Sequence, residues 1–295
     1  MGLCEELPVL HAAVCRHFLM ARDRCYSPAL VARLRDRVVR SHAQLYRTDQ
    51  RLVARAVRFV ATGFPEAVRR EIRLTGISAL ALMVPALVFG ILCYLQGDWI
   101  YTWLSVEEVA AFEAMYDPDS PVIGRDRQAD TDFQMFAYYV RNNVGIGFRS
   151  YALGLLFGIG TVMVLLFNGL SLGGIAGYLT QGGYGGVFWP FVSSHSALEL
   201  VAVVIFGAAG LRLGCAVLAP GAGGRGAALR DAGRRSVRLV IGATLMMLVA
   251  AFIEAFWSSS AGIAVEQKYL AGVVSWAAVL AYFGVLGRGR GRSPR

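Results

Sequence analysis

Long apolar runs alternate with short charged segments from about residue 74 to the end of the chain. Between Ser150 and Leu198 there is not one Asp, Glu, Lys or Arg. That run is longer than a core helix of a soluble protein requires, and about 20 apolar residues already span the hydrocarbon of a bilayer. The pattern therefore predicts an all-α fold, a polytopic helical membrane protein with about six transmembrane helices.

Four predicted spans are apolar runs bounded by charge, at residues 74–96, 188–218, 239–257 and 269–287. The stretch between the first two allows two interpretations. In the first, 131–143 is an interfacial amphipathic helix, and 145–167 and 169–187 both cross the membrane. In the second, 133–149 crosses the membrane and the glycine-rich 169–187 is re-entrant. We adopt the first, which gives six helices with both ends of the chain in the cytoplasm.

Charge is distributed in blocks of alternating sign. Residues 1–75 carry a net charge of +7, residues 97–132 carry nine acids against two arginines, and residues 225–238 are net +4. Cytoplasmic loops of membrane proteins are enriched in Lys and Arg, so the basic blocks should be cytoplasmic. We expect a cytoplasmic Arg-rich helical region at 1–73, followed by a transmembrane domain at 74–295 that includes an acidic extracytoplasmic segment at 97–132.

Composition narrows the function classes. Hydrophobic residues make up 56% of the chain and charged residues 17%, against about 25% charge in soluble domains. Nucleic-acid binding is not expected, because no basic stripe is interleaved with aromatic residues. The 1–73 region is too short to build a large core, so we expect it to lean on the membrane or on a partner.

Three ionisable residues fall in or beside apolar spans. His195 and Glu199 are four residues apart and share one helix face. A charge at such a position is costly and normally faces protein or water, so the pair is interpreted either as a functional polar centre or as a buried hydrogen bond that fixes helix packing. Glu254 either reaches the interface beside Trp257 or meets the pair. No HExxH motif occurs, and we expect no bound metal and no cofactor.

Small residues recur at four-residue spacing, which lets helix backbones approach closely in lipid. The interpretation favoured is helix packing within one chain, with homodimerisation as the alternative. Asn142, Asn143 and Asn168 are polar residues that could hydrogen-bond between helices. The packing motif comprises Gly154, Gly158, Asn168, Gly169, Gly173 and Gly177.

These features occur in a recognisable order. Asn142-Asn143 is followed by the glycines of 154–173, then by His195-x3-Glu199-Leu200, then by Gly207-Ala208-Ala209-Gly210-Leu211, and last by Ala250-Ala251-Phe252-Ile253-Glu254. Over about residues 130–260 this series resembles the stage II sporulation protein M family, the DUF95 membrane proteins. Many members have Gly after the membrane His, where this chain has Ser196.

The resemblance implies a multi-pass protein of the bacterial cytoplasmic (inner) membrane, and a scaffold or anchor rather than an enzyme. Its expected partners are the lipid bilayer and other membrane or cell-envelope proteins, with a homo-oligomer possible. The alternative function is a transporter or channel-like component that uses the His195, Glu199 and Glu254 centre. An intramembrane hydrolase is the weakest candidate, because serines beside a His on one helix rarely have triad geometry.

Overall fold

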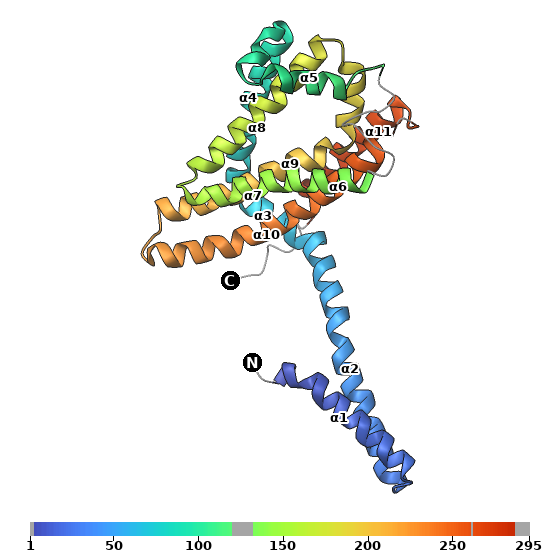
Figure 1. Cartoon of the computed structure of the whole chain (residues 1–295). Coiled ribbons are helices and arrows are strands. Elements are labelled where there is room, and N and C mark those ends of the chain that lie inside the picture. The colour runs from blue at the N-terminus through green and yellow to red at the C-terminus, as the bar shows by residue number, and fades with distance from the viewer. Residues whose placement is uncertain (1–2, 120–131, 261, 287–295) are drawn as a thin grey trace. The chain divides into compact units, whose positions relative to one another are not determined.

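The computed structural model describes residues 3–119, 132–260 and 262–286, and within these residues it is helical, with no strand. The chain divides into two compact units, Met1–Ala61 and Thr62–Arg295. Figure 1 shows the order of the helices, and each unit is described by itself. An all-α membrane fold is thus confirmed.

The first unit is a helical hairpin of α1 (Leu3–Asp23) and α2 (Pro28–Arg58). The hairpin turn contains Cys25 at φ 50°, and Pro28 begins α2, a position where its missing N–H costs nothing. His11 Nδ1 lies 2.7 Å from Ser41 Oγ and ties the helices together. Among the side chains described in this unit, only Ala21 is buried, so the hairpin has almost no core of its own.

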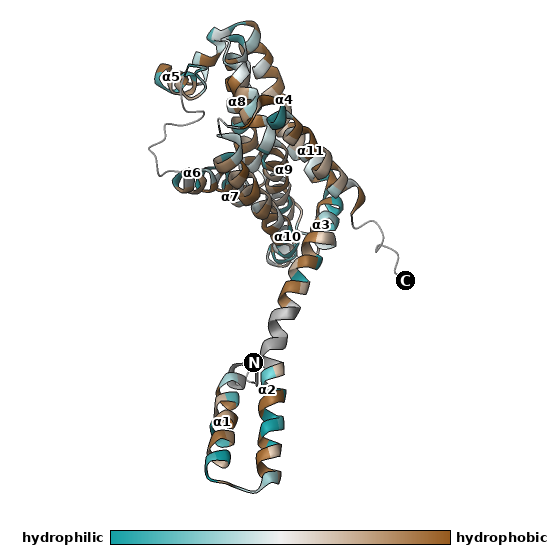
Figure 2. Cartoon of the chain, turned by 90° about the vertical axis from the view of Figure 1, so that its right-hand side faces the viewer, coloured by the Kyte–Doolittle hydropathy of each residue, from teal (hydrophilic) through white to brown (hydrophobic). Residues whose placement is uncertain are grey.

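The second unit contains five helices, among the described residues, that are long and apolar enough to cross a bilayer. Figure 2 shows the apolar colouring along them, and many of their large apolar side chains are exposed, such as Leu87, Met163 and Leu280. Such surfaces contact lipid, because water would not solvate them. The five are α4 (Ile72–Leu95), α8 (Ile159–Gln181), α9 (Gly185–Leu218), α10 (Gly224–Ile253) continued by the π-turn η5 (Glu254–Ser258), and α11 (Val265–Val285).

The predicted spans at 145–167 and 169–187 are wrong. The chain is helical through α6 (Asp132–Tyr139), the π-turn η3 (Val140–Val144), α7 (Gly145–Ala152) and the short η4 (Leu153–Leu155). It then turns sharply at Phe157 and Gly158, whose φ angles are 55° and 80°. The next helix, α8, runs without a break through the glycines of 169–177, because a second helix packs against them.

The predicted interfacial helix at 131–143 is likewise the first part of a longer segment, α6–α7, which packs against α9 and α10. The second interpretation, with a crossing at 133–149, comes closer to this arrangement. It also fails for 169–187, because α8 ends at Gln181 and α9 begins at Gly185. If α6–α7 crosses the membrane too, three crossings again separate the acidic segment from the basic one.

Glycines allow α4 and α8 to touch through their backbones. A Cβ added at Gly169, Gly173 or Gly177 would overlap the backbone carbonyl of Leu82, Ala86 or Gly90 respectively. Only glycine permits this approach, and close packing of this kind stabilises helix pairs in lipid, where apolar burial gives no drive. Gly169, Gly173 and Gly177 therefore serve helix packing within one chain.

The central helix of the unit is α9, which packs against α10, α11, α7, α4 and α8. Every residue from Ala202 to Leu211 is buried. The 3-10 turn η4 approaches α9 so closely that a Cβ added at Gly154 would overlap the backbone of Gly210. Gly147 of α7 packs against the Phe206 ring in the same way. The part of the bundle around residues Ala202–Leu211 of α9 is therefore densely packed.

Short elements cover the two ends of the bundle. At one end lie the π-turn η1 (Phe59–Gly63) and α3 (Phe64–Arg70). There Arg69 donates to the Phe283 carbonyl at 2.8 Å, and Arg212 lies 3.4 Å from Glu71. Because α3 packs on α10 and α11, the division between units falls at Ala61 rather than at residue 73.

The other end carries the 3-10 helix η2 (Gly97–Thr102) and α5 (Val106–Met115), which begins with a capping box of Ser105 and Glu108. The Tyr116 ring packs edge-on against Phe188 at 5.1 Å between centroids, which seats this segment on the start of α9.

Burial raises the pKa of the Tyr184 phenol, and the nearby carboxylates of Glu113 and Asp117 raise it further.

Substituting Gly173 with Ala should destabilise the protein by at least about 1–3 kcal/mol, because the added methyl meets backbone that cannot move aside. Gly76→Ala is the matched control, since a Cβ at Gly76 in α4 meets nothing within 4 Å. Thermal unfolding of purified protein in detergent measures both. Equal midpoints for the two variants would contradict the packing described.

Candidate functional site

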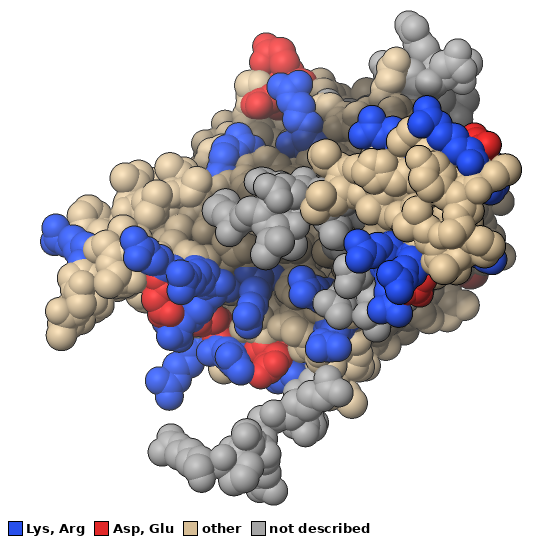
Figure 3. Space-filling view, turned by 90° about the horizontal axis from the view of Figure 1, so that it is seen from below, with Lys and Arg blue, Asp and Glu red and all other residues tan. Residues whose placement is uncertain are grey.

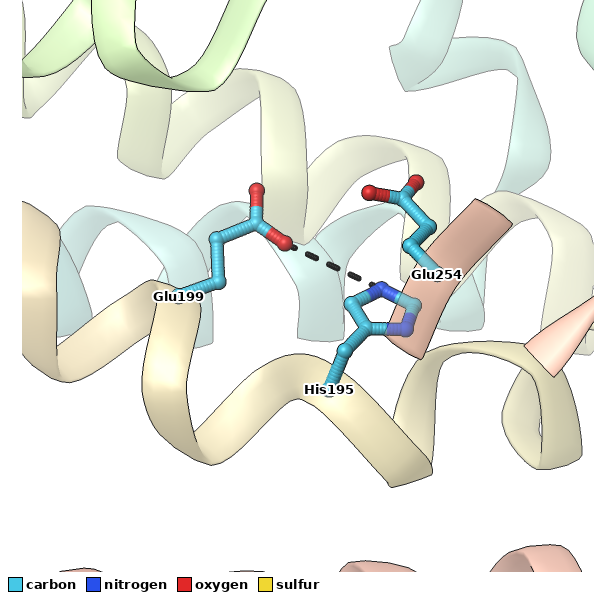
Figure 4. Close-up of side chains that lie close together, drawn as sticks. All are labelled: His195, Glu199 and Glu254. Carbon is cyan, nitrogen blue, oxygen red and sulfur yellow. Dashed lines mark ion pairs between the residues drawn. The ribbon is translucent and has the colours of Figure 1, made fainter. Parts of the chain in front are cut away.

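Helix α9 places His195 and Glu199 one turn apart, with both side chains turned to the same side (Figure 4). His195 Nε2 lies 3.7 Å from Glu199 Oε2. The His195 side chain is 4% exposed and that of Glu199 25% exposed. The imidazole is thus enclosed by protein, whereas the carboxylate borders an open space.

Glu254 joins this pair from the end of α10. Its carboxylate points towards His195 and Glu199 in Figure 4, and one ligand atom from each of the three residues lies within 4.8 Å of the others. Glu254 and Ser258 are the first and last residues of η5. A π-turn widens the helix by one residue, and such turns are frequent at functional sites.

A second π-turn faces the first. Asn142 and Asn143 lie in η3, where Asn142 Nδ2 donates to Asn143 Oδ1 at 2.8 Å. Asn143 is buried, and its Nδ2 donates to Glu254 Oε2 at 3.5 Å, a long hydrogen bond. The two asparagines therefore form a hydrogen-bonded chain that ends at the Glu254 carboxylate.

The far side of His195 is held by Ser258, whose Oγ lies 3.0 Å from His195 Nδ1. The carbonyl of Ser258 accepts a 2.8 Å hydrogen bond from Lys268 Nζ on α11. Lys268 is only 3% exposed. This buried ammonium fixes the backbone that carries Ser258, and Ser258 in turn fixes the imidazole ring.

A cavity of about 220 Å³ opens beside the three ionisable residues. Its wall is largely aromatic and apolar, with the ionisable residues and both asparagines among the lining side chains. It is lined from α5, α6, η3, α8, α9 and η5, and Leu200 is the lining residue furthest along α9. The cavity thus lies between the acidic segment that carries α5 and the densely packed part of the bundle around α9.

The family model of stage II sporulation protein M (SpoIIM) matches residues 79–259, which is more than half of the chain. The chain belongs to the SpoIIM family. No curated protein and no solved structure gives a significant match.

The SpoIIM match covers every site residue described above except Lys268. The matched region begins inside α4 and ends just beyond η5, so the hairpin of α1 and α2 lies outside it, as does α11. The three ionisable residues and both asparagines accordingly lie within the region that the family model matches.

Sequence reasoning identified the three ionisable residues and both asparagines but missed their supports. Ser258 was overlooked because a serine near a span end carries no signal by itself. Lys268 lies in the loop between the last two predicted spans, where a charge is expected in any case. Asn168 does not join the centre, since its Nδ2 donates to the Val164 carbonyl one turn earlier.

The arrangement supplies one imidazole nitrogen, two carboxylates and an amide chain at the edge of a small cavity. Such a set can bind a cation or pass a proton along the asparagines. The Ser258 hydroxyl meets the His195 ring at Nδ1, on the side away from Glu199, which lies nearest to Nε2.

Replacing Ser258 with Ala should leave His195 Nδ1 without its partner and cost about 1–3 kcal/mol of stability, as expected for a buried polar group left unsatisfied. Ser260→Ala, two residues on, serves as the control because, within the described residues, Ser260 hydrogen-bonds through its backbone N–H and not through its hydroxyl. Thermal unfolding in detergent compares the two, and an unchanged midpoint for Ser258→Ala would argue against the hydrogen bond.

Proposed function

We propose that this SpoIIM protein is a non-enzymatic anchor in the bacterial cytoplasmic membrane, and that its hairpin of α1 and α2 recruits a protein partner from the cytoplasm. The observation that carries the proposal is the hairpin itself. It is a separate compact unit, yet among its described side chains only Ala21 is buried. Two helices with so little core gain stability when a partner covers them.

The surface of the hairpin indicates the partner's chemistry. Exposed apolar side chains lie on both helices, among them Val9, Met20, Val53 and Val57. Arginines are also exposed on this hairpin, as at Arg35 and Arg55. An apolar ridge flanked by acidic residues would complement this surface, since interfaces combine buried apolar contacts with matching charge at the rim.

The packing of the bundle favours an anchor over the alternative, a transporter. The cavity beside His195 and Glu199 is what a transport function would require at one side of the membrane. On the other side, α9 is buried from Ala202 to Leu211 against glycine-mediated contacts. A passage there would have to separate helices that touch through their backbones, which dense packing resists.

The distribution of charge supports an orientation with the hairpin in the cytoplasm. Glu107, Glu108 and Glu113 lie on α5, which follows α4, whereas α3 at the other end of α4 carries Arg69 and Arg70. The start of α10 adds further arginines, and Arg70, Arg235 and Arg238 line one cavity. Figure 3 shows basic side chains gathered on the face seen from below. By the positive-inside rule that end is cytoplasmic.

Cysteine labelling tests the orientation. In a variant without the native cysteines, Glu107→Cys should react with a membrane-impermeant maleimide in intact cells, and Asp231→Cys only after lysis. Both positions are exposed, so accessibility within the protein does not limit either reaction. Labelling of both from the same side would reject the proposed topology.

Photo-crosslinking tests the recruitment. A benzophenone amino acid at Val53 or Val57, which are more than 60% exposed, should yield a discrete adduct with one cytoplasmic or membrane protein in living cells. Arg55 lies on the opposite face of the same turns, because two residues advance an α-helix by about 200°, and the same probe there should give no such adduct.

Adducts with lipid alone at Val53 and Val57 would show that the hairpin contacts the membrane surface and not a protein partner. Equal protein adducts at all three positions would show collision rather than docking. Either result contradicts the proposal.

A further inference from the structure

The centre of His195, Glu199 and Glu254 combines a donor set that suits a metal ion. One imidazole and two carboxyl groups meet in a setting where His195 and Glu254 are each less than 10% exposed. Buried charges need compensation. The buried Lys268 donates from Nζ to the backbone carbonyl of Ser258. A divalent cation bound between the two carboxylates would neutralise both.

The distances fit an ion held by all three side chains. Two ligands about 2.1 Å from a tetrahedral ion lie about 3.4 Å apart, and His195 Nε2 and Glu199 Oε2 are 3.7 Å apart. The three ligand atoms, one from each residue, lie within 4.8 Å of one another. Small side-chain rotations would bring them to bonding distance, while the backbone of α9 and η5 stays in place.

The surrounding hydrogen bonds have the form found around metal ligands. A metal-bound His donates its other ring N–H to a fixed acceptor, and bound carboxylates are themselves hydrogen-bonded. Here Ser258 Oγ meets His195 Nδ1 and leaves Nε2 directed at Glu199. Asn143 reaches Glu254. With Nδ1 protonated, Nε2 turns a lone pair towards a carboxylate oxygen, and a cation between them makes that contact favourable.

The cavity gives the centre an entry and an open coordination position. Its volume of about 220 Å³ accommodates several water molecules, and Glu199 is the most exposed of the three ligands. The wall includes Phe112 and Tyr116 from the acidic segment. A cation would thus enter from the side that carries α5, and water would complete its coordination.

We propose that His195, Glu199 and Glu254 bind a first-row divalent metal ion, with zinc the best match. Imidazole and carboxylate are the ligands that zinc and its neighbours accept, and the absence of thiolate disfavours copper(I). The ion would link α9 to η5, and so join the central helix α9 to α10, which η5 continues. This inference stands apart from the proposed anchor function and concerns the bundle alone.

The test is zinc binding by tag-free, full-length protein in detergent, measured by calorimetry and by metal content after dialysis. Wild-type protein should bind one equivalent of Zn²⁺. Glu199→Gln and Glu254→Gln keep the side-chain shape and remove a ligand charge, so each should weaken binding by at least about 100-fold, beyond the 10–100-fold typical of outer-shell changes. Glu266→Gln, an exposed glutamate at the start of α11, should bind as wild type does.

An X-ray absorption spectrum of zinc-loaded wild-type protein keeps the proposal falsifiable where a variant fails to fold. One imidazole nitrogen and several oxygens at about 2.0–2.2 Å are expected. More than one imidazole would assign the ion to the histidines of the hairpin and overturn the proposal. Absence of stoichiometric binding, or equal binding by wild type and both Gln variants, would overturn it as well. Partner crosslinking at Val53 is unaffected by either result.

Discussion

Backbone contact between helices is the constraint on which the rest of this structure depends. In lipid, apolar side chains gain little by leaving the solvent, so helices associate by fitting closely. Gly169, Gly173 and Gly177 bring α8 onto α4, and Gly154 and Gly210 bring η4 onto α9. These contacts enclose α9 and hold its polar face at a fixed depth. The centre of His195, Glu199 and Glu254 exists because that packing leaves room on one side only.

The polar centre shows how a membrane bundle can keep charged groups in place. Its residues come from α9 and η5, and two of them are held by neighbours: Ser258 contacts His195, and Asn143 of η3 contacts Glu254. Lys268 in turn holds the backbone of Ser258. An unsupported ionisable side chain at this depth would be costly. The supports explain why the centre can remain ordered inside an apolar bundle, whatever it binds.

Much of the fold follows from composition and spacing, and the errors have identifiable physical causes. Apolar runs predicted four spans close to α4, α9, α10 and α11, and helical spacing paired His195 with Glu199. The break at Phe157 was missed, because a non-glycine residue in the left-handed region leaves no mark in the sequence. The sequence predicts 169–187 as a separate crossing or a re-entrant segment, because the helix that packs on its glycines, α4, is distant in sequence. The position of Glu254 beside the pair depends on η5, and hydrophobic periodicity does not reveal a π-turn.

The π-turns also have a consequence for how the family can diverge. A π-turn is equivalent to one residue inserted into an α-helix. Deleting that residue restores the regular helix and shifts the residues inside the turn by one position, or about 100° around the axis. Loss of one residue from Val140–Val144 would turn Asn143 away from Glu254 and leave the helix otherwise intact. A relative could therefore lose or regain this support of the polar centre by a single-codon deletion or insertion, with the glycine contacts of α4 and α8 untouched. In an alignment, helix length within this segment would then separate the members that keep the centre from those that keep only the bundle.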